Sequence, residues 1–452
     1  MQRKPMPDLD ALAQALLDAA RKAGAEAADA LAVESTSLSI DVRAGALEQA
    51  ERSEQAEIGL RVLIGQKQAC VSASDTRPET MATMAERAVA MARLAPDDPY
   101  IGLAEPSQLA QGWDAEALEL ADPAPEPEAD ALRDAALEVE AAALAVEGVS
   151  QVEGTSAGFG ATRIHLAASN GFSGGYSRTG HMLQASAITG EGTAMDRDHA
   201  YEHRIFRADL PGAAAVGTLA GERAAARAGA RKPPTGTYPV LFDERIATSL
   251  IGHLLGAANG ASIARGSSWL MGKMGAQVLP DGISLIEEPS RRRTSGSRPF
   301  DGEGLAVENR PIVEDGRLLR WILDLATARQ LGLESTANAA RGTSAPPSPS
   351  VSNVTLTPGS ASREDLLASM GTGLLVTSMI GSTINPNTGD YSRGASGFWV
   401  ENGVPQYPVN ECTVAGNLLE MLPRIVAAND AQDHKSRRVP SLLIDGLTLA
   451  GA

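Results

Sequence analysis

One short motif in the sequence could bind a metal ion: HAYEH at residues 199–203. It matches the H-x-x-E-H pattern of inverted zinc peptidases, in which His199, Glu202 and His203 would lie on one helix. The neighbouring residues favour a strand instead, because residues 182–188 alternate between apolar and polar side chains. A strand would place the two histidines about 13 Å apart, which is too far for a shared ion. A zinc site here is therefore an alternative prediction, and an accidental match is favoured.

A predicted helix over residues 243–258 carries a second unusual set of side chains. Asp243 is a typical N-cap residue, and apolar residues follow at helical spacing. Another stripe of the same helix contains Thr248, Gly252 and Gly256. Each glycine inside a helix costs roughly 1 kcal/mol relative to alanine. The two glycines indicate either a close approach by another segment or a site without side chains.

The remaining histidine and cysteine signals are weaker. His253 stands alone on the predicted helix, and such a residue is more often packed or exposed than a ligand. Cys70 and Cys412 cannot form a disulfide framework or a multi-cysteine zinc site. Cys412 has no basic neighbour in sequence, so we expect a buried structural thiol. The residues alone therefore assign no catalytic side chain.

The segment 385–403 is rich in turn residues and small residues. Asn402-Gly403 predicts a hairpin between two strands. The strand before this turn carries small side chains at residues 394–397, and such residues weaken a strand unless another backbone or a ligand comes close. Two interpretations stay open. An extended peptide could add alongside this strand, or the hairpin could pack tightly under a neighbouring strand.

Composition and charge restrict the partners of the protein. Its 452 residues are enough for two or three domains with separate cores. The net charge of −17 disfavours binding to nucleic acid, and the basic cluster at 291–293 has the composition of a solvated loop. No run of 18 apolar residues predicts a membrane span, and the N-terminal residues lack a secretory signal pattern. We therefore expect a cytoplasmic protein that binds neither nucleic acid nor membrane.

The order of the predicted elements indicates an α+β fold. Residues 1–232 predict an N-terminal domain in which a unit of helix, antiparallel meander and helix occurs twice, at about 8–95 and 129–229. Residues 237–452 predict a mainly β C-terminal domain with a few helices. Within it, residues 342–350 (GTSAPPSPS) have the composition of a mobile surface loop.

The segment 385–418 resembles the TldD/PmbA family, specifically its PmbA (TldE) branch. The residues that carry the resemblance are Asn385-Pro386, GDYSRG at 389–394, GFWVENG at 397–403, YPV at 407–409 and AGNL at 415–418. The strand that contains Tyr238-Pro239-Val240 and the meander at 38–64 also fit. The resemblance therefore covers essentially the whole chain.

This resemblance implies a cytosolic zinc metalloprotease of two subunits that trims leader peptides or degrades small unfolded proteins. The TldD branch carries an H-E-x-x-x-H motif on its central helix and a cysteine ligand near its C-terminus. Imidazoles and a thiolate can hold zinc, and the glutamate can act as a base toward bound water. PmbA-type subunits pair with TldD and form part of the enclosure around the peptide substrate.

The sequence departs from the family pattern where the zinc motif should be. Counted from the Pro239-Val240 strand, the motif would fall at residues 251–256, which read IGHLLG. Ile251, Gly252 and Gly256 thus occupy the positions of the two histidines and the glutamate. Residues 429–439 contain no cysteine. The resemblance implies no catalytic residue, no metal and no cofactor in this chain, with zinc expected in the TldD partner.

The leading prediction is a PmbA/TldE-type subunit of a heterodimeric metalloprotease that shapes the substrate cavity. The residues predicted to contact an extended peptide are Asp390, Arg393, Gly394, Ser396 and Gly397. The forked donors of Arg393 suit a carboxylate. Two alternatives stay open: a stand-alone zinc peptidase that uses residues 199–203, and a binding or regulatory protein that acts without TldD. The sequence leaves open the substrate, the interface residues and whether the isolated chain forms a homodimer.

Overall fold

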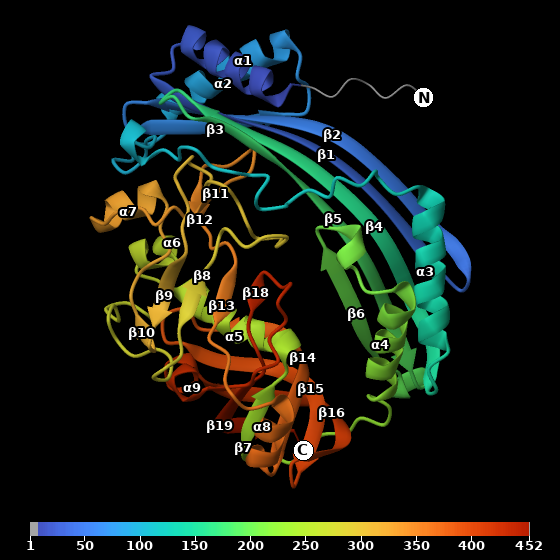
Figure 1. The fold of residues 1–452 in the computed structure, drawn as a ribbon. Helices are drawn as coiled ribbons and strands as arrows, with labels where there is room; N and C mark the ends of the chain where they lie inside the picture. Colours follow the sequence, from blue (N-terminus) through green and yellow to red (C-terminus); the bar gives the residue numbers. More distant parts are fainter. Residues whose placement is uncertain (1–7, 452) are drawn as a thin grey trace.

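The computed structural model, which describes residues 8–451, contains a long curved sheet formed by the first half of the chain (Figure 1). Its strands are β1 (Ala27–Arg43), β2 (Ala46–Ile64), β3 (Lys67–Ala73), β4 (Val149–Ala168), β5 (Ser173–Thr189) and β6 (Asp196–Arg204). They pair antiparallel in the order β3-β2-β1-β4-β5-β6. The central pairing joins β1 to β4, so that two meanders distant in sequence form one surface.

Two pairs of helices cover one face of this sheet. They are α1 (Leu9–Ala23) with α2 (Pro78–Leu94), and α3 (Ala129–Leu144) with α4 (Ala213–Ala225). Strand alternation sorts the side chains of β1: Ala30 and Ile40 are buried against the helices, whereas Leu31 lies on the opposite face. Helices α3 and α4 approach closely at Gly217, where a Cβ atom would lie 2.1 Å from the carbonyl oxygen of Val139. The other face of the sheet is concave and faces the C-terminal half (Figure 1).

The C-terminal half is organised around a second, strongly curved sheet. Its strands are β7 (Gly236–Phe242), β14 (Gly373–Ile384), β15 (Asp390–Glu401), β16 (Val404–Asn417), β17 (Val426–Ala427) and β19 (Leu442–Ala450). The order is β16-β15-β14-β7-β19-β17, and β16 also pairs with β19, which closes the sheet into a ring. The predicted hairpin joins β15 to β16, and both Asn402 and Gly403 have positive φ, as a type I′ turn requires.

Helix α5 (Glu244–Ala257) packs on this sheet directly after β7. Asp243 caps it by accepting a hydrogen bond from the backbone N–H of Arg245, and Leu250 and Leu254 are fully buried in the main core. The helix predicted at 243–258 is confirmed within one residue at each end. Among residues 8–451, no helix is both long and apolar enough to cross a membrane.

Smaller elements fill the space between the two large sheets. The sheet β10-β9-β8-β13-β18 consists of β8 (Leu285–Glu287), β9 (Arg310–Glu314), β10 (Arg317–Leu318), β13 (Val354–Leu356) and β18 (Arg437–Arg438), and β11 (Ala339–Ala340) pairs with β12 (Ser348–Pro349). The short helices are α6 (Gly260–Ala264), α7 (Leu325–Leu331), α8 (Arg363–Met370) and α9 (Leu418–Met421). Single 3-10 turns lie at Pro106–Gln108, Gly192–Ala194, Arg207–Asp209 and Leu422–Arg424. The predicted α+β class is confirmed, whereas the division into domains at 1–232 and 237–452 stays a prediction.

The segment 342–350 differs in part from the predicted surface loop. Residues 344–346 are exposed, but Thr343 is buried against β2. A Cβ atom at Gly59 would lie 2.1 Å from the carbonyl oxygen of Thr343, so this glycine permits the contact. The C-terminal half is thereby docked on the concave face of the first sheet.

Candidate functional site

A groove follows the concave face of the first sheet, opposite the C-terminal half. Three adjoining cavities of about 300, 440 and 430 Å³ form it. The first and second cavities share His203, Ile205 and Ser295, and the second and third share Arg178. Because neighbouring cavities share walls, the groove leads from the end of β6 to the loop that contains β11.

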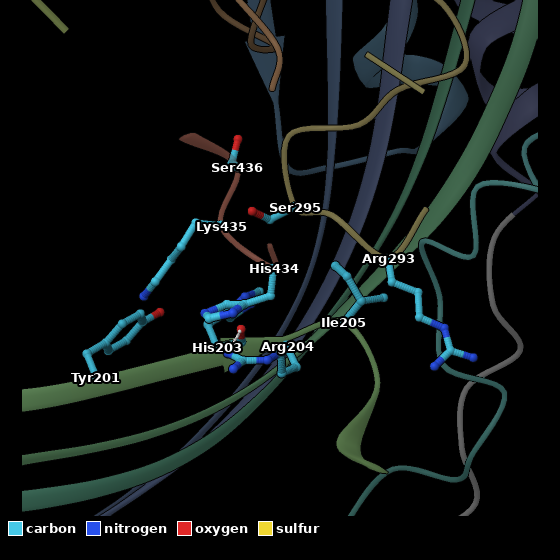
Figure 2. Close-up of a pocket in the computed structure, with 9 residues that line it drawn as sticks. All are labelled: Tyr201, His203, Arg204, Ile205, Arg293, Ser295, His434, Lys435 and Ser436. Carbon is cyan, nitrogen blue, oxygen red and sulfur yellow. Dashed lines mark hydrogen bonds between the residues drawn. The ribbon is translucent and has the colours of Figure 1, made fainter. Parts of the chain in front are cut away.

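The first cavity lies at the end of β6 (Figure 2). Tyr201, His203 and Arg204 come from β6, and His434 and Lys435 come from the loop before β18. Burial lowers the pKa of His434 to about 4, and the charges of Arg204 and Lys435 act in the same direction. Burial likewise lowers the pKa of His203. Both imidazoles are therefore neutral at pH 7 and offer hydrogen bonds without charge.

The H-x-x-E-H motif lies in β6, as its alternating surroundings predict, and not in a helix. His199 is exposed and its Nδ1 is 3.7 Å from Asp198. Glu202 instead forms an ion pair with Arg204 at 2.7 Å and lies 3.7 Å from Nε2 of His434. The helical arrangement that the pattern requires is therefore missing. Within the described part of the chain, no group of three or more His, Cys, Asp or Glu residues is arranged to hold a metal ion.

The three positions of the family zinc motif on α5 have different surroundings. Ile251 is fully buried in the apolar core. A Cβ atom at Gly252 would lie 3.0 Å from Nη1 of Arg437, so that guanidinium lies against the helix. Gly256 is exposed and has open space where a side chain would be. The glycine stripe thus faces β18 at one position and open space at the next.

His253, also on α5, packs against the core of the C-terminal sheet. Its ring centroid lies 6.0 Å from that of Tyr391 on β15. Its Nε2 atom is buried and has no hydrogen-bond partner among residues 8–451. Burial and the nearby charge of Arg393 lower the pKa of His253, which keeps the imidazole neutral at pH 7. This histidine therefore belongs to the helix–sheet packing.

Strand β15 has no free edge, because it pairs with β14 on one side and with β16 on the other. The interpretation that a peptide adds alongside this strand is wrong, since strand addition needs unpaired backbone groups. Tight packing accounts for Gly397, where a Cβ atom would lie 1.9 Å from the carbonyl oxygen of Leu375. Gly394 is less crowded, with the carbonyl oxygen of Ile380 at 3.4 Å from such an atom.

The polar residues predicted on β15 serve different contacts. Asp390 accepts hydrogen bonds from Thr388 and Asn417, and these bonds lower its pKa. Arg393 donates to the carbonyl of Gly381 at 2.7 Å and to the hydroxyl of Ser249 at 3.3 Å. Asp390 therefore orders the turn, and Arg393 joins β15 to a neighbouring loop and α5. Peptide contact by these residues stays a prediction.

Ser396 is the predicted β15 residue that lines a cavity, and it does so together with His199. This cavity of about 460 Å³ also contains Ser378 and Ile380 of β14 and Asp198 of β6. One residue of each candidate set, His199 and Ser396, thus lines the same cavity although the two are far apart in sequence. Most residues that line this cavity are polar. Ile380, which is 74% exposed, adds an aliphatic side chain.

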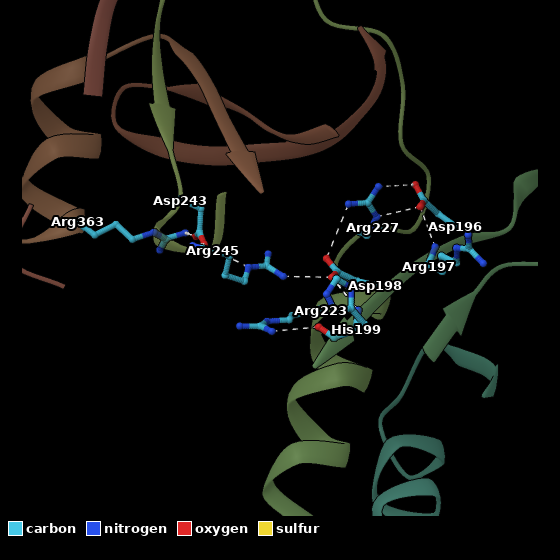
Figure 3. A network of polar contacts seen from close by, with 9 residues as sticks. All are labelled: Asp196, Arg197, Asp198, His199, Arg223, Arg227, Asp243, Arg245 and Arg363. Atoms are coloured by element: carbon cyan, nitrogen blue, oxygen red, sulfur yellow. Dashed lines mark hydrogen bonds and ion pairs between the residues drawn. The ribbon is translucent and has the colours of Figure 1, made fainter. Parts of the chain in front are cut away.

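A network of ion pairs joins the first sheet to α5 beside this cavity (Figure 3). Arg227, which follows α4, contacts Asp196 at 2.9 Å and Asp198 at 3.8 Å. Arg245 then connects Asp198 to Asp243, at 3.1 and 3.2 Å. Arg363 of α8 completes the network by contacting Asp243 at 3.2 Å. Three arginines face three aspartates, so the buried charges are balanced, and the network holds α5 in a fixed position relative to β6.

Comparison with known proteins gives matches along the chain. Models of PmbA/TldA metallopeptidase domain 1, its central domain and its C-terminal domain match residues 28–92, 122–232 and 235–451. "Metalloprotease PmbA" of Escherichia coli O157:H7 is 36% identical over 427 residues, which are 94% of this chain and 92% of that protein. These matches agree with the resemblance found in residues 385–418.

Solved structures show the same architecture. A protein of Bacteroides thetaiotaomicron VPI-5482, named as a candidate modulator of DNA gyrase, is 29% identical with a TM-score of 0.90 over 98% of both chains. TldE from Thermococcus kodakarensis has 20% identity and a TM-score of 0.83, and the match covers 97% of this chain and 99% of that one. The second structure supports the fold alone.

Proposed function

Because this chain belongs to the PmbA/TldA metallopeptidase family, we propose that it is a PmbA/TldE-type subunit of a heterodimeric zinc metalloprotease. In this proposal the enzyme is cytoplasmic and processes or degrades peptides and small unfolded proteins. A TldD-type partner carries the zinc ion. This chain contributes a wall of the substrate cavity and does not itself cleave the peptide bond.

The observation that carries the proposal is the surroundings of the three α5 positions. Ile251 offers only an aliphatic side chain inside the core, and Gly252 and Gly256 offer none. Residues 429–439, where the family resemblance would put a cysteine ligand, contain none, and Arg437 of β18 lies against Gly252. A catalytic zinc site needs about three protein ligands from N, O or S atoms. The residues present do not fit this ion, and a guanidinium beside the position would repel it.

The groove supports the peptide part of the proposal. It is long because its cavities follow one another along the concave sheet, and its walls contain apolar side chains, neutral imidazoles and several arginines. Such walls suit an extended chain, which presents apolar side chains and uncharged amide groups. The ion-pair network from Asp196 to Arg363 would keep β6 and α5 in a fixed relative position while a peptide is bound.

The proposal can be tested with purified subunits. The chain and a TldD-type subunit are assayed for peptide hydrolysis separately and after mixing, and the zinc content of each is measured by mass spectrometry. We expect hydrolysis only in the mixture, a stable complex on size exclusion, and zinc in the partner alone.

Two results would contradict the proposal and identify an alternative. Stoichiometric zinc in this chain that is lost in His199→Ala, together with hydrolysis by the chain alone, would favour a stand-alone peptidase. Gln151→Ala, an exposed polar substitution on strand β4 of the same sheet, is the matched control. Failure to form any complex with the TldD-type subunit would favour a binding or regulatory protein.

A further inference from the structure

A buried arginine with unused hydrogen-bond donors lies at the third cavity of the groove. The side chain of Arg341 is 2% exposed and binds Asp29 of β1 through Nη1. Its Nε and Nη2 atoms have no hydrogen-bond partner within residues 8–451. An unpaired buried donor destabilises the fold, and more strongly when it is charged. Arg341 lines a cavity of about 430 Å³, so an acceptor that entered this space could supply the missing hydrogen bonds.

The charge around Arg341 is not balanced by the protein. Asp29 lies between Arg341 and Arg61, so one buried carboxylate faces two guanidinium groups. Glu303 is the next acid near Arg61, but burial and the neighbouring Asp301 raise its pKa to about 8. Glu303 is therefore largely protonated at pH 7. A buried excess of positive charge is costly unless an anion pairs with it.

The other charged residues of the cavity already have partners or lie further out. Arg298 and Arg178 donate to backbone carbonyls, including that of Ala339 and that of Ser295. Asp301 accepts three backbone N–H groups, those of residues 303, 305 and 339. Glu57 of β2 is half-buried on the wall. Counted together with Arg61 and Asp29, four arginines face three acids (Asp29, Glu57 and Asp301) around the cavity, and this excess of positive charge favours an anionic ligand.

Most of the remaining wall of the cavity is apolar, and Thr343, Ser350 and Ser352 add hydroxyl groups. The apolar part is formed by Leu31 and Val33 of β1, Ile164 and Leu166 of β4, Tyr176 of β5, and Phe300. The rings of Tyr176 and Phe300 are 5.6 Å apart and pack edge to face. A volume of about 430 Å³ lies within the usual range of small-ligand sites. The cavity therefore suits a ligand that joins an apolar group to an anion.

We propose that this cavity binds the carboxylate of a C-terminal peptide residue, with Arg341 holding the carboxylate and the apolar walls receiving the last side chain. A planar guanidinium with two free donors matches the two oxygens of a carboxylate. The adjoining cavity lies toward β6 and would receive the preceding residues, with Arg178, which donates to the carbonyl oxygen of Ser295, between the two cavities. This inference rests on the peptide-binding part of the proposed function. A free N-acyl amino acid presents the same chemistry and is compared directly.

The test measures binding to the isolated full chain by isothermal titration calorimetry. The probes are a hexapeptide that ends in phenylalanine with a free carboxylate, the same peptide as a C-terminal amide, and N-acetylphenylalanine with its amide. We expect the free-acid peptide to bind about tenfold or more tightly than its amide, because a bidentate charged pair is lost in the amide. Arg341→Met is expected to reduce this ratio to about one, because the bidentate partner is gone.

Two further variants keep the test decisive if Arg341→Met folds poorly. Val33→Trp fills the cavity without touching the arginines, and we expect it to abolish binding of acid and amide alike. Val404→Trp adds the same side chain at an exposed valine of the β15–β16 hairpin, and binding should be unchanged. Thermal unfolding of each variant reports whether the fold is intact.

Several results would overturn the inference. They are equal affinity for acid and amide, an acid preference that survives in folded Arg341→Met, and unchanged binding in Val33→Trp. Binding of N-acetylphenylalanine without binding of the peptide would overturn the assignment to a peptide end. Because no partner subunit and no hydrolysis enter this experiment, a failed hydrolysis test of the proposed complex would leave its result unaffected.

Discussion

Two buried clusters of arginine and aspartate join the halves of this protein, and they differ in charge balance. The network between β6 and α5 contains three arginines and three aspartates, each with at least one partner of opposite charge. The cluster of Asp29, Arg61 and Arg341 contains one aspartate for two arginines, and donors of Arg341 stay unused. The network with equal numbers of opposite charges needs no further ion, although Nε of Arg363 also lacks a hydrogen-bond partner, whereas an excess of buried positive charge favours an added anion. The difference separates a structural contact from a candidate ligand site.

The largest expected effect is at the shared carboxylate of the unbalanced cluster. Asp29→Asn would leave two buried guanidinium groups without a counter-ion, and we expect a loss of about 3–5 kcal/mol in the free energy of unfolding. Urea unfolding followed by circular dichroism measures this loss. Asp75→Asn, which removes an exposed partner of Arg77, is the matched control and should leave the urea midpoint nearly unchanged. A similar small loss for both variants would mean that the cluster is not buried as described.

A smaller effect is expected in the balanced network. In Asp198→Asn, Arg227 keeps Asp196 and Arg245 keeps Asp243, so each guanidinium retains a carboxylate. We expect a loss of about 1–3 kcal/mol, together with faster hydrogen exchange in β6. Urea unfolding and exchange mass spectrometry provide the measurements. A loss larger than that of Asp29→Asn would reverse the proposed difference between the clusters.

Removal of Arg341, which has two donors without partners, should have little effect on the free energy of unfolding. Arg341→Met leaves the neutral pair of Asp29 and Arg61, and methionine occupies much of the same space. We expect a change within about 1 kcal/mol, because replacing a poorly compensated buried charge by an apolar group is often neutral. A loss above about 3 kcal/mol in the same urea titration would show that Arg341 is required for folding, and the ligand assignment would then depend on Val33→Trp alone.

The smallest expected effect is a pH dependence of ligand binding. The pKa of Glu303 is raised to about 8 by burial and Asp301, with Asp324 acting in the same direction and Arg61 against it. Below that pH the protonated, neutral Glu303 leaves the excess positive charge of Arg61 and Arg341 uncompensated. Above it the ionised group competes with a bound carboxylate. The preference for acid over amide peptide should therefore fall several-fold between pH 7 and pH 9.

Glu303→Gln tests this pH dependence, because the amide cannot ionise. The acid preference of this variant should stay constant over the same range in calorimetric titrations. A fall of equal size in the variant would assign the pH dependence to another group. The free energy of unfolding should also fall as pH rises. A carboxyl with a raised pKa, such as Glu303, stabilises the folded state fully below its unfolded pKa, and this contribution is lost as pH rises through about 8.

Local patterns predicted much of the fold. Alternation identified β6 as a strand despite its H-x-x-E-H motif, and the capping residue Asp243 located the start of α5. Asn402-Gly403 predicted the β15–β16 hairpin. These predictions succeeded because strand period, helix caps and type I′ turns depend on residues that are close in sequence. The predicted strand addition at β15 failed because the pairing of its edges depends on β14 and β16, which no pattern within residues 390–401 reveals.

The sequence by itself determined the elements, the family and the missing ligand side chains at residues 251, 252 and 256. Only the tertiary structure decided what surrounds those positions, since Arg437 reaches Gly252 from a strand nearly two hundred residues later. It also decided the meeting of Asp29, Arg61 and Arg341, which come from β1, β2 and the loop after β11. Burial and charge balance depend on which distant segments pack together, and in this fold β1 is covered on one face by helices and on the other by the C-terminal half. The glycines of α5 could be read from the sequence, but the uncompensated arginine could not.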